Sequence, residues 1–247
     1  SKFSILLEGP PKQGKTHFAT TMPDPTFLVA DQNYKAHESH GVRFFVIDNW
    51  VEWEQRFRPA ITQRIFPGDT IVLDTVSALF RKLERHLAKN NLALEGYQEW
   101  NHFRGNAIKL ADDLNAARKP EGDHPGYNIC VLTHQKTETD TGGNVIGYLP
   151  DISSKLDRSF AGLFDAHFCT SVETENDLVR DSKGSPTGET VQTSKYFIHS
   201  TPPTSRHNAG DNLGGDGKKY SKLPPKLGNT FPELLKEWGV SDSEPSK

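Results

Sequence analysis

Eight residues near the start of the chain have the types and spacing needed to bind phosphate. Residues 9–16, GPPKQGKT, follow the pattern Gly, four variable residues, then Gly-Lys-Thr, which is typical of phosphate-binding loops. In such loops backbone N–H groups point inward and bind phosphate oxygens, while the lysine reaches the β- and γ-phosphates. The pattern predicts a nucleotide site formed by Gly9, Pro10, Pro11, Lys12, Gln13, Gly14, Lys15, Thr16 and His17.

A magnesium ion is the second expectation raised by this loop. The Thr16 hydroxyl occupies the position that ligates Mg²⁺ in phosphate-loop proteins, which also use a carboxylate at the end of a neighbouring strand. Asp74 supplies that carboxylate, because it closes the apolar and β-branched run TIVLD. We expect Asp74 to hold the metal through water, and Lys15 and Asp74 to act in catalysis with ATP and Mg²⁺ as cofactors.

These residues need a fold that brings the ends of strands together. The apolar run before the loop predicts a buried strand, and the residues from Lys15 onward suit a helix. Further strand-like runs and helical patterns alternate as far as Gln135, with strands at 25–31, 42–48, 70–73 and 127–135 and helical spacing at 51–65, after 75 and at 96–120. This alternation predicts an α/β fold whose mostly parallel central sheet is flanked by helices.

The second half of the chain predicts an addition to that sheet. Residues 136–150 suggest a loop or hairpin around Gly142-Gly143, and 153–164 suit a helix. Two alternating runs, 166–175 and 190–200, predict an antiparallel extension on one edge. We expect one domain over 1–239, closed by a short helix at 231–239, with an irregular, partly mobile segment at 201–229 and a disordered tail at 240–247.

Composition narrows the classes of protein that fit. The chain has 247 residues, a formal net charge of -3, 34% hydrophobic residues and 25% charged residues, so it can bury a core but has no global nucleic-acid signature. No apolar run approaches the roughly 20 residues that span a membrane, and no secretory signal is visible. Cys130 and Cys169 lie in apolar runs, which predicts core residues in a reducing, cytoplasmic compartment.

Several motifs together resemble the RecA-like phosphate-loop ATPases. Besides the loop, they are FLVAD (27–31), TIVLDTVSAL (70–79), VLTHQK (131–136) and PDISSKLDRSFAGLFDAHF (150–168). The likeness covers most of residues 3–235. It is greatest to a compact, AAA-type, phage-encoded group associated with single-strand annealing and recombination.

The resemblance implies an ATPase that is stimulated by single-stranded DNA and acts in phage recombination or annealing. It implies a host-cytoplasmic location, and it makes a homo-oligomer and single-strand-binding or other recombination proteins candidate partners. Two rival functions stay open: a nucleotide-gated DNA- or protein-binding module with negligible turnover, and a small-molecule kinase. The absence of arginine from 136–150 weakens the kinase, and the absence of an Asn-Lys-x-Asp stretch argues against a GTPase.

The resemblance also assigns roles outside the loop. Thr133, His134 and Gln135 become a γ-phosphate sensor, with Gln135 among the catalytic candidates; the alternative is a strand end that needs polar residues. Where relatives carry a water-activating Glu, this chain has Asp31, Gln32 and Asn33, so Asp31 is the candidate base. Arg206 is the candidate finger that reaches a neighbour's ATP, against the alternative of a solvated loop.

The remaining motifs each have two interpretations. Residues 136–150 match the position of a DNA-contacting loop, although Lys136 is their only cation. In 96–105, Tyr97, Trp100 and Phe103 either stack on bases with Arg104 on the DNA backbone or pack a helix on the core, and we favour packing. The histidines of HESH (37–40) and the pair His167 and Cys169 lack the further ligands that a structural zinc needs, so the sequence predicts no zinc site.

Overall fold

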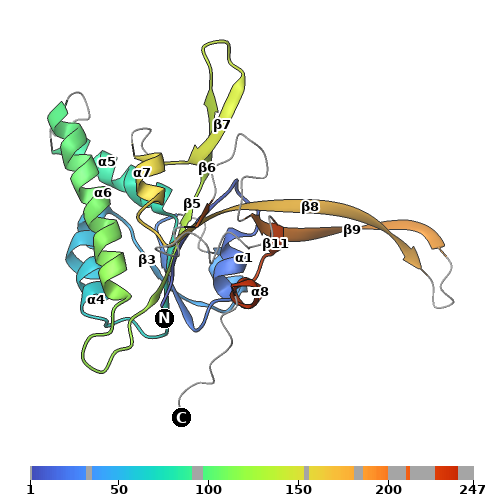
Figure 1. Ribbon diagram of the computed structural model, residues 1–247, viewed down its shortest axis with the longest axis horizontal. Helices are drawn as coiled ribbons and strands as arrows, with labels where there is room; N and C mark the ends of the chain where they lie inside the picture. Colours follow the sequence, from blue (N-terminus) through green and yellow to red (C-terminus); the bar gives the residue numbers. More distant parts are fainter. Residues whose placement is uncertain are drawn as a thin grey trace.

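A nine-stranded sheet forms the centre of the computed structural model, which describes residues 2–31, 35–90, 97–152, 156–180, 186–199, 210–211 and 226–238 (Figure 1). The strand order is β11-β9-β8-β1-β5-β4-β2-β3, with β10 beside β8. The strands are β1 Ser4–Glu8, β2 Pro25–Val29, β3 Arg43–Val46, β4 Thr70–Asp74, β5 Asn128–Thr133, β8 Ala166–Arg180, β9 Pro186–His199, β10 Gly210–Asp211 and β11 Lys226–Gly228.

Most of this sheet is parallel, as predicted. β3, β2, β4, β5, β1 and β8 pair in parallel, whereas β9 and β10 pair with β8, and β11 with β9, in the antiparallel sense. β8 therefore ends the parallel sheet and begins the antiparallel extension. The fold class is α/β, with a mostly parallel central sheet and an antiparallel extension on one edge. Because parallel strands end at one edge of a sheet, the ends of β1, β4 and β5 lie together.

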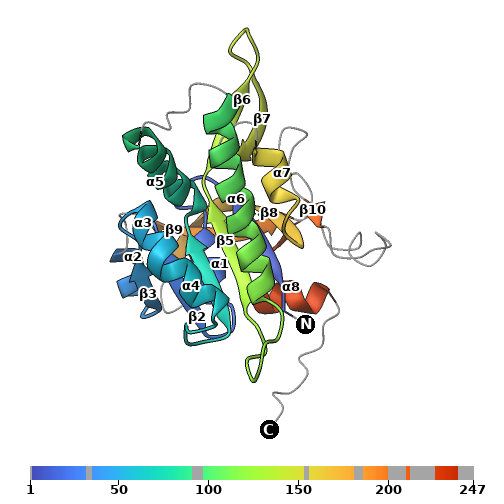
Figure 2. The ribbon, with the colours of Figure 1, turned by 90° about the vertical axis from the view of Figure 1, so that its left-hand side faces the viewer.

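Helices cover both faces of the sheet. They are α1 Lys15–Thr20, α2 Lys35–Ser39, α3 Trp50–Glu52, α4 Arg58–Thr62, α5 Val76–Lys89, α6 Tyr97–Ala117, α7 Asp157–Ala161 and α8 Phe231–Glu237. In Figure 1, α4, α5 and α6 lie on one side of the sheet and α1 and α8 on the other, and Figure 2 looks onto the side of α4, α5 and α6. Alternate residues of β1 point to opposite faces: Leu6 packs in the core cluster under α3 to α7, and Ile5 and Leu7 pack in the cluster under α1 and α8.

The helical run after β3 is not one regular α-helix. A π-helical turn, Trp53–Phe57, separates α3 from α4, and Pro59 lies in the first turn of α4. Proline is commonly found in the first turn of a helix. Trp53, Phe57 and Ile61 remain buried in the core, so the apolar face that the sequence predicts is kept.

Two hairpins extend from the sheet, the shorter formed by β6 Gln135–Thr139 and β7 Val145–Pro150 and the longer by β8 and β9 (Figure 1). The shorter one turns where the sequence predicts. The Asp140 carboxylate accepts hydrogen bonds from the N–H groups of Gly142 and Asn144, both at 2.8 Å. Gly143 has φ 81°, a conformation that favours glycine.

Both cysteines are buried and free, as expected for core residues. Among the described residues, no helix is long and apolar enough to cross a membrane. In the region predicted to be irregular, the described pieces are β10 and β11, and β11 adds to the antiparallel edge. The rest of 201–225 and the tail from 239 onward lie outside the described residues.

Candidate active site

A cavity of about 570 Å³ lies at the edge of the sheet where β1 runs into α1. Its walls come from the loop after β1, the first turn of α1, the ends of β2, β4 and β5, the α2 region, and one residue of β9. The lining residues are Pro11, Lys12, Gly14, Lys15, Thr16, His17, Asp31, His37, His40, Asp74, Thr75, His134 and Tyr196.

The phosphate loop requires its two glycines because side chains from other segments pack closely against its backbone. Gly14 has φ 84°, and a Cβ on it would lie 2.6 Å from the side-chain nitrogen of Asn229, which donates to the Gly14 carbonyl at 2.8 Å. A Cβ on Gly9 would lie 2.0 Å from the Thr170 hydroxyl. The loop thus packs on β8 and on the residue after β11 with no room for side chains at these positions.

Lys15 is buried inside the loop that carries it. Its Nζ donates to the carbonyl oxygens of Gly9 and Pro10, both at 2.7 Å. Burial lowers the pKa of Lys15 to about 8, although the negative charges of Asp74 and Asp31 act to raise it. The ammonium group therefore sits at the cavity in a site that favours an anionic ligand.

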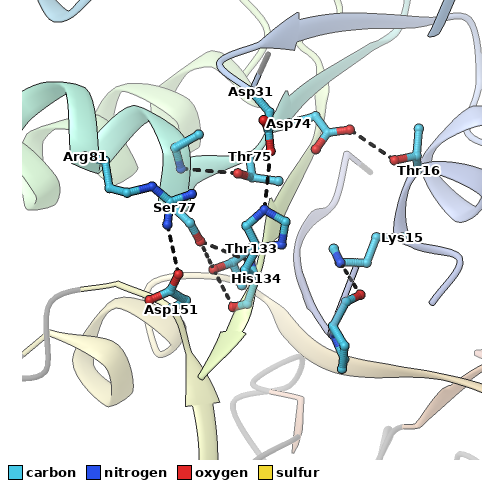
Figure 3. A network of polar contacts seen from close by, with 12 residues as sticks. Lys15, Thr16, Asp31, Asp74, Thr75, Ser77, Arg81, Thr133, His134 and Asp151 are labelled. Atoms are coloured by element: carbon cyan, nitrogen blue, oxygen red, sulfur yellow. Dashed lines mark hydrogen bonds and ion pairs between the residues drawn. The ribbon is translucent and has the colours of Figure 1, made fainter. Parts of the chain in front are cut away.

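Thr16 of α1 and Asp74 at the end of β4 meet at the edge of the sheet (Figure 3). The Thr16 hydroxyl donates to Asp74 Oδ2 at 3.1 Å. Burial raises the pKa of Asp74 to about 6, and the charge of Asp31 adds to this, whereas Thr16 and Lys15 oppose it. A hydroxyl and a buried carboxylate are hard oxygen donors of the kind that Mg²⁺ prefers, so this pair fits the ion predicted from the sequence.

His37 is a member of the site that the sequence did not reveal. It lies on α2, is 3% exposed, and its Nε2 is 3.4 Å from Asp74 Oδ2. Burial lowers the pKa of His37 to about 4, with a smaller contribution from His40, so the imidazole is neutral at pH 7. Its sequence signal is the HESH stretch, whose two histidines suggest at most a zinc motif; the structure instead puts both histidines at the cavity.

Asp31 and His134 form a second polar pair at the cavity. His134 Nε2 lies 3.4 Å from Asp31 Oδ2. The His134 backbone N–H donates to the Ser77 hydroxyl at 3.0 Å, and that hydroxyl lies 2.8 Å from the hydroxyl of Thr133 (Figure 3). Thr133 is fully buried and does not line the cavity, so of the three sensor candidates only His134 reaches it.

Comparison with known protein families identifies the family of this chain. A family model described as an AAA domain matches residues 1–213. The chain belongs to this family. Among curated proteins, none matches the chain.

Three solved structures resemble the AAA domain at low sequence identity. A RadB recombinase is 12% identical, with 85% of this chain and 90% of that chain covered and a TM-score of 0.44. An ATPase from the type III secretion system of pathogenic bacteria is 13% identical, with 68% and 50% covered and a TM-score of 0.45. The flagellar accessory protein FlaH from Methanocaldococcus jannaschii is 9% identical, with 84% and 88% covered and a TM-score of 0.30.

Two further residues of the AAA domain differ from the sequence-based picture of the site. Gln135 does not line the cavity; its side-chain nitrogen donates to Glu8 Oε1 at 3.2 Å. Tyr196 of β9, which sequence reasoning missed, does line it, and its ring centroid lies 6.2 Å from that of His17. Nothing in the local sequence signals Tyr196, because its position depends on how β9 folds back along β8.

The candidate DNA-contacting aromatics of α6 belong to the core. Phe103 is fully buried, and the partly buried Trp100 stacks on it with ring centroids 5.8 Å apart, so the favoured interpretation of a packed helix face is confirmed for both. The Tyr97 side chain lies outside the described residues. Lys136, the one cation of 136–150, donates to the Ile152 carbonyl at 2.6 Å.

Three residues named in the sequence analysis lie outside the described residues. They are Arg206, the candidate finger, and Gln32 and Asn33, which follow Asp31 where relatives carry a catalytic Glu.

Proposed function

We propose that this AAA domain binds ATP with Mg²⁺ at residues 9–16 and hydrolyses it. One observation carries the proposal. The hydroxyl of Thr16 and the carboxylate of Asp74, which come from different elements, meet at 3.1 Å beside Lys15 at a cavity of about 570 Å³. That volume is of the size found for small-molecule and cofactor sites.

Each charged or polar group has a role in holding the triphosphate. Lys15 contributes a positive charge that is poorly compensated by its present carbonyl partners, so phosphate oxygens are better acceptors for it. Thr16 and Asp74 would hold Mg²⁺, which when bound neutralises charge on the phosphates. The backbone N–H groups of the loop bind the remaining oxygens, and Gly14 keeps the backbone accessible.

Asp31 is the residue that activates the attacking water. Its carboxylate lines the same cavity as Lys15 and Thr16, and His134 lies at 3.4 Å from it. Asp31 accepts a proton from the attacking water, and His134 positions the carboxylate. This pair replaces the Glu that is missing after β2, since a carboxylate with a shorter side chain needs a partner to fix its orientation.

The nucleoside has a platform in Tyr196. This ring is 37% exposed and lies at the cavity next to His17. An exposed aromatic ring beside a phosphate site offers a surface on which a purine base can stack. β9 thereby contributes to nucleotide binding from outside the parallel part of the sheet.

We further propose single-stranded DNA as the partner, in recombination or annealing. The support comes from connectivity. The hairpin β6–β7 begins one residue after His134, so a movement of His134 on hydrolysis is passed directly to a projecting element. That hairpin occupies the position in which the family resemblance expects a DNA contact.

The test is ATP turnover with and without single-stranded DNA, with Lys15→Ala as the blank. Stimulation by DNA, absent in the blank, is the expected result. Turnover that is indifferent to DNA would remove the DNA partner and leave the ATPase. ATP binding without any turnover would support a nucleotide-gated binding module instead, and turnover that requires a phosphate acceptor would support a kinase.

A further inference from the structure

Three metal-ligating side chains meet next to the phosphate loop but outside its cavity. Glu8 ends β1, and His167 and Cys169 lie two residues apart on β8. β1 and β8 pair in parallel, with Leu6 opposite His167 and Glu8 opposite Cys169. Because paired residues and alternate residues of a strand share a face of the sheet, all three side chains project from the same face.

The distances between the three groups are those of a shared site. Glu8 Oε2 lies 2.9 Å from His167 Nε2, and Glu8 Oε1 lies 3.2 Å from Cys169 Sγ. One ligand atom from each residue lies within 4.8 Å of the other two. Ligands at about 2.0–2.3 Å from a tetrahedral zinc ion are roughly 3–4 Å apart, so only small side-chain movements separate the present arrangement from coordination.

All three side chains of the cluster are buried. Glu8 is 0% exposed, Cys169 is 1% exposed and His167 is 6% exposed. A buried carboxylate is stable only when it is paired, hydrogen-bonded or bound to a metal. Glu8 is hydrogen-bonded by His167, Cys169 and Gln135, and of these three only His167, when protonated, brings a positive charge. A bound cation would supply that charge directly.

We propose that Glu8, His167 and Cys169 bind a zinc ion. A carboxylate, an imidazole and a thiolate form a mixed donor set that suits Zn²⁺ and is unlike the all-oxygen set preferred by Mg²⁺. The carboxylate and the thiolate together cancel the 2+ charge of Zn²⁺, and the neutral imidazole adds no charge. A net charge of zero minimises the free energy that burial of the site costs.

Zinc binding has a defined proton balance. Burial raises the pKa of the Cys169 thiol well above its usual value, with the Glu8 carboxylate adding to the effect, so the thiol is protonated in the metal-free protein. Formation of the Zn–S bond breaks the S–H bond, and the proton leaves to solvent. No electron is transferred, and no further reactant is needed.

Gln135 is the neighbouring residue from which a fourth ligand could come. That residue is partly buried, and its side-chain amide contacts Glu8 Oε1 at 3.2 Å. The amide oxygen of Gln135 or a water molecule can complete the tetrahedron. The ion would then join the end of β1, β8 and the start of β6. Because Glu8 directly precedes Gly9, such a structural site would fix where the phosphate loop begins.

The rival state is a metal-free hydrogen-bonded cluster. In it, His167 is protonated and pairs with Glu8, and the Cys169 thiol donates to the same carboxylate. This state has the same geometry but contains no metal–thiolate bond. Metal content and the spectrum of a bound metal therefore separate the two states.

The experiment measures metal binding by the full chain without an affinity tag and without nucleotide. Protein stripped with a chelator is incubated with Zn²⁺, dialysed and assayed for zinc, and a second sample is loaded with Co²⁺. We expect about one zinc per chain and a cobalt spectrum with thiolate-to-metal charge transfer. Cys169→Ala should lose that band and weaken zinc binding by at least about 100-fold.

Cys130→Ala is the matched control. Cys130 is also a buried, free cysteine of the central sheet, but it packs in the hydrophobic cluster on the other face. This variant should bind zinc like the wild type. His167→Gln provides a second ligand variant whose loss of zinc does not depend on a thiol.

Three results would overturn the proposal. They are a wild-type protein that retains no zinc and gives no charge-transfer band, zinc binding unaffected by Cys169→Ala, or equal loss from Cys130→Ala. If Cys169→Ala does not fold, the wild-type cobalt spectrum still decides, because the metal-free cluster gives no such band. The outcome is independent of ATP binding, which is measured separately.

Discussion

The Thr16 hydroxyl donates a 3.1 Å hydrogen bond to the carboxylate of Asp74, a residue 58 positions further along the chain. Asp74 is almost entirely buried, so the structure brings a carboxylate into a site where burial disfavours its charge. This is an arrangement that costs stability in the absence of a cation. We expect the cost to be measurable in the protein without nucleotide.

Asp74→Asn should stabilise the nucleotide-free protein at pH 7.5. The pKa of Asp74 is raised from 3.8 to about 6 in the folded state, so the folded state binds its proton more tightly than the unfolded state does. The penalty is absent below pH 3.8, grows as the pH rises, and is complete above about pH 6. Removing the charge should therefore raise the free energy of unfolding by about 1–3 kcal/mol, as measured by urea denaturation.

Asp69→Asn is the control for this stability measurement. Asp69 is exposed and pairs with Lys2, so its replacement should change stability by no more than about 0.5 kcal/mol. The gain from Asp74→Asn should also shrink at pH 4. A gain that is equal at both pH values, or a loss at pH 7.5, would contradict the buried-charge interpretation.

Asp31→Asn should lower kcat while ATP binding is retained. An amide cannot accept the proton of the attacking water, and general-base contributions are about 10²–10⁴-fold. His134→Ala should lower kcat through the same carboxylate, so the double variant should be little worse than Asp31→Asn alone. Single-turnover hydrolysis measures both effects; fully additive losses would show that the two residues act separately.

Tyr196 should contribute to affinity for the nucleoside rather than to chemistry. Tyr196→Ala should weaken ATP binding by roughly tenfold, since aromatic stacking on a base is worth about 1–3 kcal/mol. Tyr196→Phe keeps the ring and should bind ATP like the wild type. Equal losses in the two variants would point to the hydroxyl instead, and a titration with a fluorescent ATP analogue distinguishes these cases.

Affinity for Mg-ATP should be highest between about pH 6 and pH 8. Below about pH 6, Asp74 is protonated and cannot ligate a metal; above about pH 8, free Lys15 loses the charge that attracts phosphate. Equilibrium binding across pH 5–10 measures both limits. In Asp74→Asn the acidic limit should vanish, and its persistence would assign that limit to another group.

The phosphate loop and the parallel sheet were predictable because both depend on local sequence. The phosphate-binding residues of the loop lie within eight consecutive positions. The buried strand before Gly9 and the buried strand that ends at Asp74 can be predicted from their continuous apolar runs. Alternation of strands and helices then implies that the strand ends meet. The meeting of Thr16 and Asp74 follows from this reasoning alone.

The other members of the site were not predictable because they depend on packing between distant segments. His37 reaches Asp74 only through the way α2 packs on Phe27, whose ring centroid lies 4.9 Å from that of the imidazole. Tyr196 reaches the cavity through the path of β9. Glu8 joins His167 and Cys169 through the β1–β8 register, which nothing in the local sequence specifies.

The most direct test of the nucleotide site is steady-state ATP hydrolysis by the wild type, Lys15→Ala and Lys89→Ala, each with Mg²⁺ and with excess chelator. Lys89 is an exposed lysine at the end of α5 and is the matched control. We predict Mg²⁺-dependent turnover in the wild type and in Lys89→Ala, and a loss of at least about 100-fold in Lys15→Ala. Turnover by Lys15→Ala equal to that of the wild type would contradict the assignment of the site.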